Sequence, residues 1–257
     1  MHHIDRFDAR AVTWFLRLFG LALLIDVVTE LAAGVWHVHT GRFYPWRHLG
    51  IVPLYPAGVL VVEWALRAGA GLALLAGARR AKVVAAAVRV AALVLFVAVL
   101  ERYSNHGALL FLVAFFLTLG PPDVGAADFD GREHPALGLV RAQLVIVYVF
   151  SAINKVAHGF GSGRSLVHLL GGAISPGQAT ALSLLVIATE LAIPVVLVRR
   201  PRAGIALVVA MHAAFALLVP GVISFGVAMT ALAVLFAHRP RSSASASASS
   251  GKARSSF

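Results

Sequence analysis

The run KVVAAAVRVAALVLFVAVLE, residues 82–101, contains one charged side chain, Arg89, between Lys82 and Glu101 at its two ends. An α-helix needs about 20 mainly apolar residues to cross the hydrocarbon core of a bilayer. This run therefore predicts a transmembrane helix.

Further apolar runs, long enough to span the bilayer or nearly so, lie on both sides of it at 11–35, 56–77, 107–120, 137–156, 179–198, 203–219 and 222–237. Glycine and proline separate most of them, as expected of turns. We therefore predict an all-α integral membrane protein, a bundle of about eight transmembrane helices. The expected divisions are an N-terminal segment 1–10, a transmembrane domain 11–238 and a low-complexity tail 239–257 that is too polar to pack.

The composition supports a lipid-facing surface. Hydrophobic residues make up 60% of the chain and charged residues 13%, whereas soluble domains carry about 25% charged residues. The net charge of +11 comes from short basic clusters between the apolar runs, which is typical of membrane anchors and excludes a groove for nucleic acid. Cysteine is absent, which excludes disulfides, thiolate metal sites and thiol relays.

Lysine and arginine also predict the orientation, because they accumulate in cytoplasmic segments. With the N-terminus inside, five of them fall on the outer face: Arg42, Arg47, Arg102, Lys155 and Arg164. Fourteen fall on the inner face: Arg6, Arg10, Arg79, Arg80, Lys82, Arg132, Arg141, Arg199, Arg200, Arg202, Arg239, Arg241, Lys252 and Arg254. The protein is therefore predicted to lie in the cell membrane, with both termini in the cytoplasm.

Several ionisable side chains fall inside the predicted spans, where each costs roughly 2.5–3.5 kcal/mol on insertion scales. They are Arg17, Asp26, Glu30, Glu63, Arg67, Arg89, Glu101 and Glu190, with His212 as a titratable companion. One interpretation is mutual neutralisation that holds helices together, with the acidic residues paired to Arg67 or Arg89. A proton or cation site at Asp26 and Glu30, which share a helix face, is the alternative.

Two stretches carry candidate chemistry: RYSNHG at 102–107, and RAQLVIVYVFSAINKVAHGFGSG at 141–163. In the second, Tyr148, Ser151 and Lys155 have the i, i+3, i+7 spacing of one helix face. A lysine withdrawn from water has its ammonium form disfavoured and can serve as a general base. The alternative is that Lys155 only extends towards the outer interface.

The histidines have similar alternatives. His37, His39 and His48 are close enough in sequence for a metal site, but their spacing matches no common one, so no metal is predicted. His212 within a span needs a partner, and Glu190 is the candidate. Asn105 is placed to cap the fourth helix, and His106 and Tyr148 to lie at the interface.

These stretches resemble the vitamin K-dependent gamma-glutamyl carboxylase family and its bacterial relatives, the HTTM domain proteins. The family's pattern R-x-Q-x-x-x-x-Y, then Lys, Trp and Gly, is matched by Arg141, Gln143, Tyr148, Lys155 and Gly163, with Phe160 in place of Trp. Further matches, in order along the chain, are Phe15, Arg17 and Gly20, Asn105 and His106, Glu190 and His212, and Phe225 and Met229.

The resemblance implies an enzyme in which a reduced naphthoquinone, vitamin K or menaquinol, reacts with O2 and leaves as its epoxide. Lys155 would be the base, with His106 and His212 as further catalytic residues. Quinol binding would fall to Arg102, Asn105, Gln143, Tyr148 and Phe160. If the reaction is coupled to carboxylation of a peptide or small molecule, CO2 would be a further substrate. The active site would lie towards the extracytoplasmic face.

The chain shows no counterpart of the family's large extramembrane substrate region. A second interpretation is therefore a non-catalytic membrane component, such as a subunit, maturation or immunity partner of a peptide-modification system. A transporter is the third, because of the intramembrane charges, although no inverted repeat is evident.

Overall fold

The computed structural model describes residues 7–34, 57–101, 105–120, 134–218 and 222–237, and these fold into helices throughout. The longer helices are α1 (Ala9–Ala32), α3 (Ala57–Gly77), α4 (Ala81–Glu101), α6 (Pro135–Ala157), α8 (Pro176–Arg199) and α9 (Pro201–Leu218). The shorter ones are α5 (Asn105–Thr118), the single 3-10 turn η1 (Phe160–Ser162), α7 (Arg164–Leu169) and α10 (Ile223–Val234). The predicted all-α fold is confirmed.

Six helices are long and apolar enough to cross a membrane, whereas α5 and α10 are shorter. Their outer surfaces fit lipid: Leu217 is 86% exposed, Phe150 71% and Leu93 65%, side chains whose exposure to water would be unfavourable. The chain is thus a multi-pass helical membrane protein. Passage of all eight apolar helices across the bilayer stays a prediction.

Local sequence explains where the helices begin. The Asp8 carboxylate accepts a hydrogen bond of 2.7 Å from the backbone N–H of Arg10 at the start of α1. At the start of α8, Ser175 and Gln178 form a reciprocal capping box, which satisfies backbone groups that have no partner within the helix. Prolines occupy the first turns of α6 and α8, where the missing N–H costs nothing.

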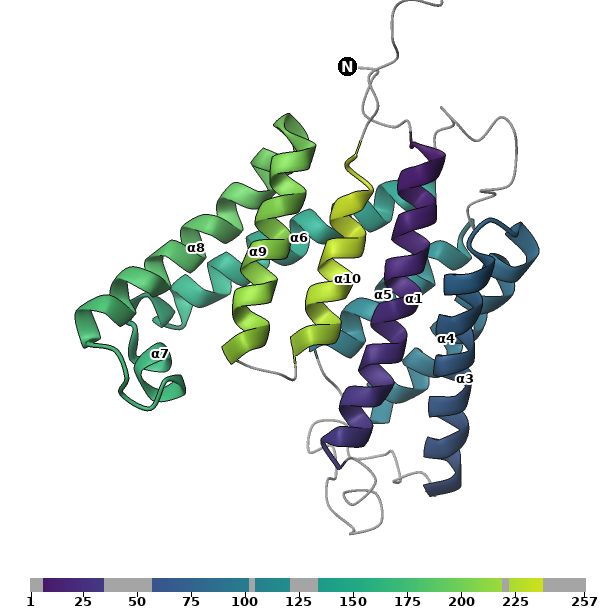
Figure 1. Ribbon diagram of the computed structural model, residues 1–257, viewed down its shortest axis with the longest axis horizontal. Coiled ribbons are helices and arrows are strands. Elements are labelled where there is room, and N and C mark those ends of the chain that lie inside the picture. The colour runs from purple at the N-terminus through teal and green to yellow at the C-terminus, as the bar shows by residue number, and fades with distance from the viewer. Residues whose placement is uncertain (1–6, 35–56, 102–104, 121–133, 219–221, 238–257) are drawn as a thin grey trace, which may run out of the picture.

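The helices form two connected parts (Figure 1). In the first, α1 packs against α3 and α10, α3 against α4, and α4 against α5. In the second, α6 packs against α8, and α8 against α9. Helix α6 also contacts α5, and α10 contacts α9, so α6 and α10 connect the two parts.

The tightest approach within the first part is between α1 and α3. A Cβ atom added to Gly20 would come within 2.6 Å of the Gly71 carbonyl oxygen, and one added to Gly71 within 2.7 Å of the Gly20 carbonyl oxygen. Glycine at both positions lets the two backbones touch, as is common in membrane helix pairs. Since Arg67 lies one turn before Gly71, this contact brings Arg67 against α1.

Arg141 fastens α6 to the end of α10. Its Nε donates a hydrogen bond of 2.9 Å to the Leu235 carbonyl oxygen, and its guanidinium lies 4.0 Å from the centre of the Phe7 ring. Arg141, the first residue of the matched motif, is thus engaged in packing at the end of the bundle that holds the start of α1.

Candidate functional site

Lys155, in the last turn of α6, lies in a polar cluster with Ser151 and Glu190. Its Nζ donates to the Glu190 Oε1 at 2.7 Å and to the Ser151 Oγ at 2.6 Å, and the Ser151 hydroxyl donates to the same Glu190 oxygen at 3.1 Å. We call Ser151, Lys155 and Glu190 the Lys155 cluster. The side chain of Lys155 is 22% exposed and that of Glu190 5%, so Lys155 does more than extend towards the interface.

Glu190 retains unused hydrogen-bonding capacity. Its second oxygen, Oε2, is buried and has no partner among the described residues, although a buried carboxylate oxygen normally accepts hydrogen bonds. Pro194 lies within α8 four residues later. Because proline has no N–H, the Glu190 carbonyl lacks the donor that an uninterrupted helix would supply.

Tyr148, two turns before Lys155 on α6, forms a buried pair with His212 on α9. The Tyr148 hydroxyl lies 2.9 Å from the His212 Nε2, with exposures of 2% and 7% for the two residues. The partner of His212 is therefore Tyr148, and the prediction of Glu190 as that partner is wrong. The imidazole also packs edge-on against Phe225, with 5.4 Å between ring centres.

The Lys155 cluster and the Tyr148–His212 pair are adjacent. Tyr148, Ser151 and Lys155 lie along one face of α6, as their spacing predicts. The arrangement combines a cation, a carboxylate, an imidazole and two hydroxyls in an otherwise apolar bundle.

Phe160, in η1, covers one side of the Lys155 cluster, with its ring centre 5.9 Å from the Lys155 Nζ. The segment after it is fixed to α8, because the Thr180 hydroxyl donates to the Ser162 carbonyl oxygen at 3.0 Å. Gly163 has φ +76°, and a Cβ there would lie 2.4 Å from the Thr180 nitrogen. Glycine is therefore required for this close approach.

A second polar cluster surrounds Arg67, whose side chain is 1% exposed. The guanidinium forms ion pairs with Asp26, with Glu63, and with Glu30 at 3.2 Å between Nη1 and Oε1. The Trp64 Nε1–H donates to the Glu30 Oε2 at 2.6 Å. We call Asp26, Glu30, Glu63, Trp64 and Arg67 the Arg67 cluster.

Of the two arginines predicted to pair with these acids, Arg67 contacts all three, one guanidinium against three carboxyl groups, whereas Arg89 is exposed on α4. The Arg67 cluster joins α1 to α3 through charges that are buried and multiply hydrogen bonded.

His106 belongs beside the Arg67 cluster. Its Nε2 lies 3.4 Å from the Asp26 Oδ1, and the Ser224 hydroxyl donates to the same oxygen at 3.3 Å. Ser224 precedes Phe225, the ring that packs on His212. The first turn of α10 therefore connects the two polar regions, and His106 lies at the Arg67 cluster, where its Nε2 faces Asp26.

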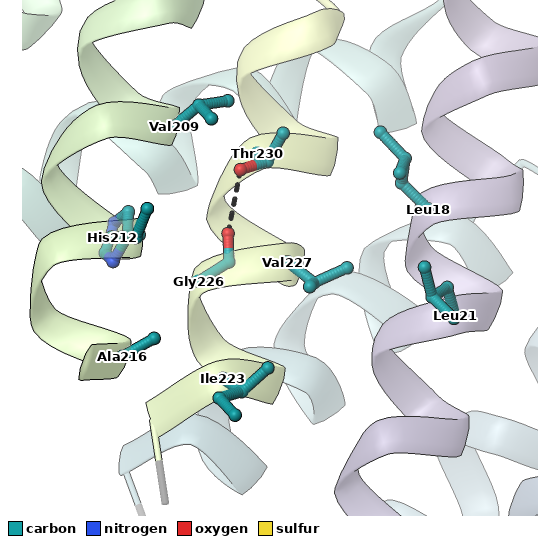
Figure 2. A pocket seen from close by; sticks show the side chains of 10 residues that line it. Leu18, Leu21, Val209, His212, Ala216, Ile223, Gly226, Val227 and Thr230 are labelled. Atoms are coloured by element: carbon teal, nitrogen blue, oxygen red, sulfur yellow. Dashed lines mark hydrogen bonds between the residues drawn. The ribbon is translucent and has the colours of Figure 1, made fainter. Parts of the chain in front are cut away.

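An apolar groove runs along α10 between α1 and α9, with a volume of about 250 Å³. Figure 2 shows its walls, with Leu18 and Leu21 facing Val227 and Thr230 across it. His212 is also one of the lining residues. Gly226 permits the packing there, because a Cβ would lie 3.0 Å from the His212 Cβ.

The remaining predicted residues are placed as follows. Arg102 lies outside the described residues, as do His37, His39 and His48. Asn105 is the first residue of α5, and Gln143 is half-buried on α6. Within the described ranges, no group of three histidine or acidic side chains is arranged to hold a metal.

Sequence reasoning missed the pairing of Lys155 with Glu190 and the role of Trp64. The i, i+4 spacing of Ser151 and Lys155 was a usable signal, but the contact with Glu190 depends on how α8 packs against α6. Trp64 likewise follows Glu63 directly, and nothing local shows that it faces Glu30 on α1.

The fold and the two clusters define a class: a multi-pass helical membrane protein with intramembrane polar sites. A scan against protein-family models, a search of curated proteins and a search of solved structures each found no match to the chain. The carboxylase-family resemblance therefore stays a prediction, carried by the residues of the chain itself.

Proposed function

We propose that this protein is a membrane enzyme that promotes the reaction of a reduced naphthoquinone, of the vitamin K or menaquinol type, with O2 to give the quinone epoxide. The observation that carries the proposal is the Lys155 cluster, where the Lys155 Nζ is held 2.7 Å from the Oε1 of a carboxylate whose other oxygen has no partner in the described part of the chain. A base withdrawn from water, close to lipid, suits a substrate that arrives through the bilayer.

The residues present fit a hydroquinone. Its hydroxyl groups need acceptors, which the Glu190 Oε2 and the Lys155 amine can supply, and its rings need an apolar surface, which Phe160 can supply. A bound hydroquinone would provide the electrons that reduce O2, with one oxygen atom entering the epoxide and the other leaving as water with the two hydroxyl protons. The His212 imidazole, held by Tyr148, is a further polar contact on the same side of α6.

We assign the base to Lys155 and a proton store to Glu190. In the arrangement described, Lys155 donates hydrogen bonds to Glu190 and Ser151. Transfer of one proton from Nζ to Glu190 along their contact leaves a neutral amine, which can accept the hydroxyl proton. The fixed hydrogen bonds of Ser151 and Glu190 then orient the lysine and reduce reorganisation.

The proposal includes the topology predicted above: about eight spans, both termini in the cytoplasm, and the site near the extracytoplasmic face of the cell membrane. Coupling to carboxylation would add CO2 and a peptide or small-molecule substrate.

The test uses protein purified in detergent and supplied with chemically reduced menaquinone or vitamin K in air, with products separated by chromatography. We expect the wild-type protein to form the epoxide and Lys155→Ala to lose it while remaining folded. Lys82→Ala, which removes an exposed lysine at the start of α4, is the matched control and should keep the wild-type rate. Full quinol oxidation by Lys155→Ala would overturn the proposal.

The second candidate is a non-catalytic component of a peptide-modification system. It is favoured by the same ion pair, because a lysine neutralised by Glu190 is also a complete structural contact between α6 and α8. No epoxide from folded wild-type protein, together with a stoichiometric partner in purification from the native membrane, would support this function instead.

A further inference from the structure

Arg17 is an ionised side chain within a membrane helix that has no ion-pair partner among the described residues. Its Nε is buried without a hydrogen-bond partner, and its contact is the ring of Trp14, with 5.7 Å from the guanidinium carbon to the ring centre. An arginine in a span costs roughly 2.5–3.5 kcal/mol on insertion scales unless it is compensated. Within the described part of the chain this charge therefore has no counter-ion, and an anionic ligand would compensate it.

The position of Arg17 places it at one end of the apolar groove. It directly precedes Leu18 and lies one turn before Leu21, and both leucines line the α1 wall of the groove. Helical side chains lean towards the N-terminus of their helix, and the contact of Arg17 with Trp14, three residues earlier, has this direction. The guanidinium thus extends beyond the groove towards the start of α1.

Trp14 indicates that Arg17 lies close to the bilayer–water interface. Its side chain is 56% exposed, and exposed tryptophans of membrane helices are enriched at the bilayer–water interface. Arg17 lies eight residues after Ala9, roughly 12 Å along α1 at 1.5 Å per residue, a depth from which an arginine side chain can reach the headgroup region.

The groove supplies the complementary apolar half. Between Ile223 and Thr230 it follows α10 for roughly 10 Å, and its walls are aliphatic except for His212 and Thr230. The Thr230 hydroxyl is satisfied by the Gly226 carbonyl oxygen at 2.9 Å (Figure 2). A groove on the surface of a membrane protein with these walls accepts a hydrocarbon chain.

We propose that this surface binds an anionic phospholipid, with its phosphate at Arg17 beside Trp14 and one acyl chain in the groove between α1, α9 and α10. The charge of Arg17 selects an anionic headgroup over a zwitterionic one. The bound chain covers the face of His212 that lines the groove, so that the Tyr148–His212 pair is closed off from this side and substrates reach the Lys155 cluster from the side of Phe160.

Native mass spectrometry of the detergent-purified chain measures the lipids that it retains. The probes are phosphatidylglycerol and phosphatidylcholine with identical acyl chains. We expect the wild-type protein to retain phosphatidylglycerol about fivefold more tightly, the factor for one basic side chain near anionic lipid. Arg17→Gln should remove this preference, Arg17→Lys should keep it, and Arg89→Gln, the same charge loss at an exposed site on α4, should leave it unchanged.

The acyl-chain half has its own variant. Val227→Trp fills the groove and should lower retention of both lipids, while circular dichroism confirms the helical fold. Equal retention of the two lipids by wild-type protein, an unchanged preference in Arg17→Gln, or an equal loss in Arg89→Gln would overturn the headgroup assignment. Undiminished retention by folded Val227→Trp would overturn the groove as the site of the chain. None of these outcomes depends on epoxide formation.

Discussion

The Arg67 cluster and the Lys155 cluster are both ion pairs inside a membrane bundle, but they differ in the exposure of the cation and in the number of carboxylates around it. Arg67 is 1% exposed, and both terminal nitrogens of its guanidinium contact carboxylates on α1 and α3. Lys155 is 22% exposed and contacts one carboxylate, whose second oxygen has no partner among the described residues. The first arrangement fastens helices together. The second keeps a cation and a free acceptor near the surface, which is what chemistry on an incoming substrate needs.

The largest expected effect on stability comes from removing the cation of the Arg67 cluster. Arg67→Met leaves Asp26 and Glu63 buried without it, and breaking a buried ion pair in this way costs about 3–5 kcal/mol. Thermal unfolding in detergent should show a strongly lowered midpoint or failure to fold. Arg89→Met, at an exposed position of α4, is the control and should unfold near the wild-type temperature. Equal midpoints for the two variants would mean that the Arg67 cluster does not hold the bundle.

A smaller effect on stability is expected at the Lys155 cluster. Lys155→Met leaves the Glu190 carboxylate without its cation and should lower the free energy of unfolding by about 1–3 kcal/mol, the cost of an unsatisfied buried group. Replacing both partners, with Lys155→Met and Glu190→Leu together, should restore most of this loss, because an apolar pair avoids desolvating two charges. A double variant less stable than either single one would contradict the ion-pair interpretation.

The smallest effect is expected at Ser183, one of the polar residues on the buried face of α8. Its hydroxyl is fully buried and has no hydrogen-bond partner among the described residues. Ser183→Ala should leave the free energy of unfolding unchanged or raise it by about 1 kcal/mol, since a buried hydroxyl without a partner is unfavourable. Destabilisation of the folded protein by this variant would show that Ser183 binds a group within the bundle.

The helices were largely predictable, because each depends on a contiguous apolar run. The predicted run 179–198 became Pro176–Arg199, and 137–156 became Pro135–Ala157, with the small differences arising from proline and capping residues at the ends. The Tyr148, Ser151 and Lys155 face was also predictable, because helical spacing is a local property.

The partners across helices were not predictable. Glu190 was a reasonable partner for His212 by burial alone, but the packing of α6 against α8 puts Lys155 at Glu190, while Tyr148 reaches His212 on α9. The position of His106 was not predictable either. The family resemblance groups it with Lys155, whereas its place at the start of α5 puts its imidazole beside Asp26.

In the proposed function the Arg67 cluster holds the fold and the Lys155 cluster carries the chemistry, and the rates of epoxide formation by Lys155→Ala and His106→Gln test this division most directly. Rates are normalised to folded protein, and thermal unfolding is measured for the same samples. The account predicts that Lys155→Ala loses epoxide formation, whereas His106→Gln keeps most of the wild-type rate and unfolds at a lower temperature. Loss of activity in folded His106→Gln, with activity retained in Lys155→Ala, would contradict it.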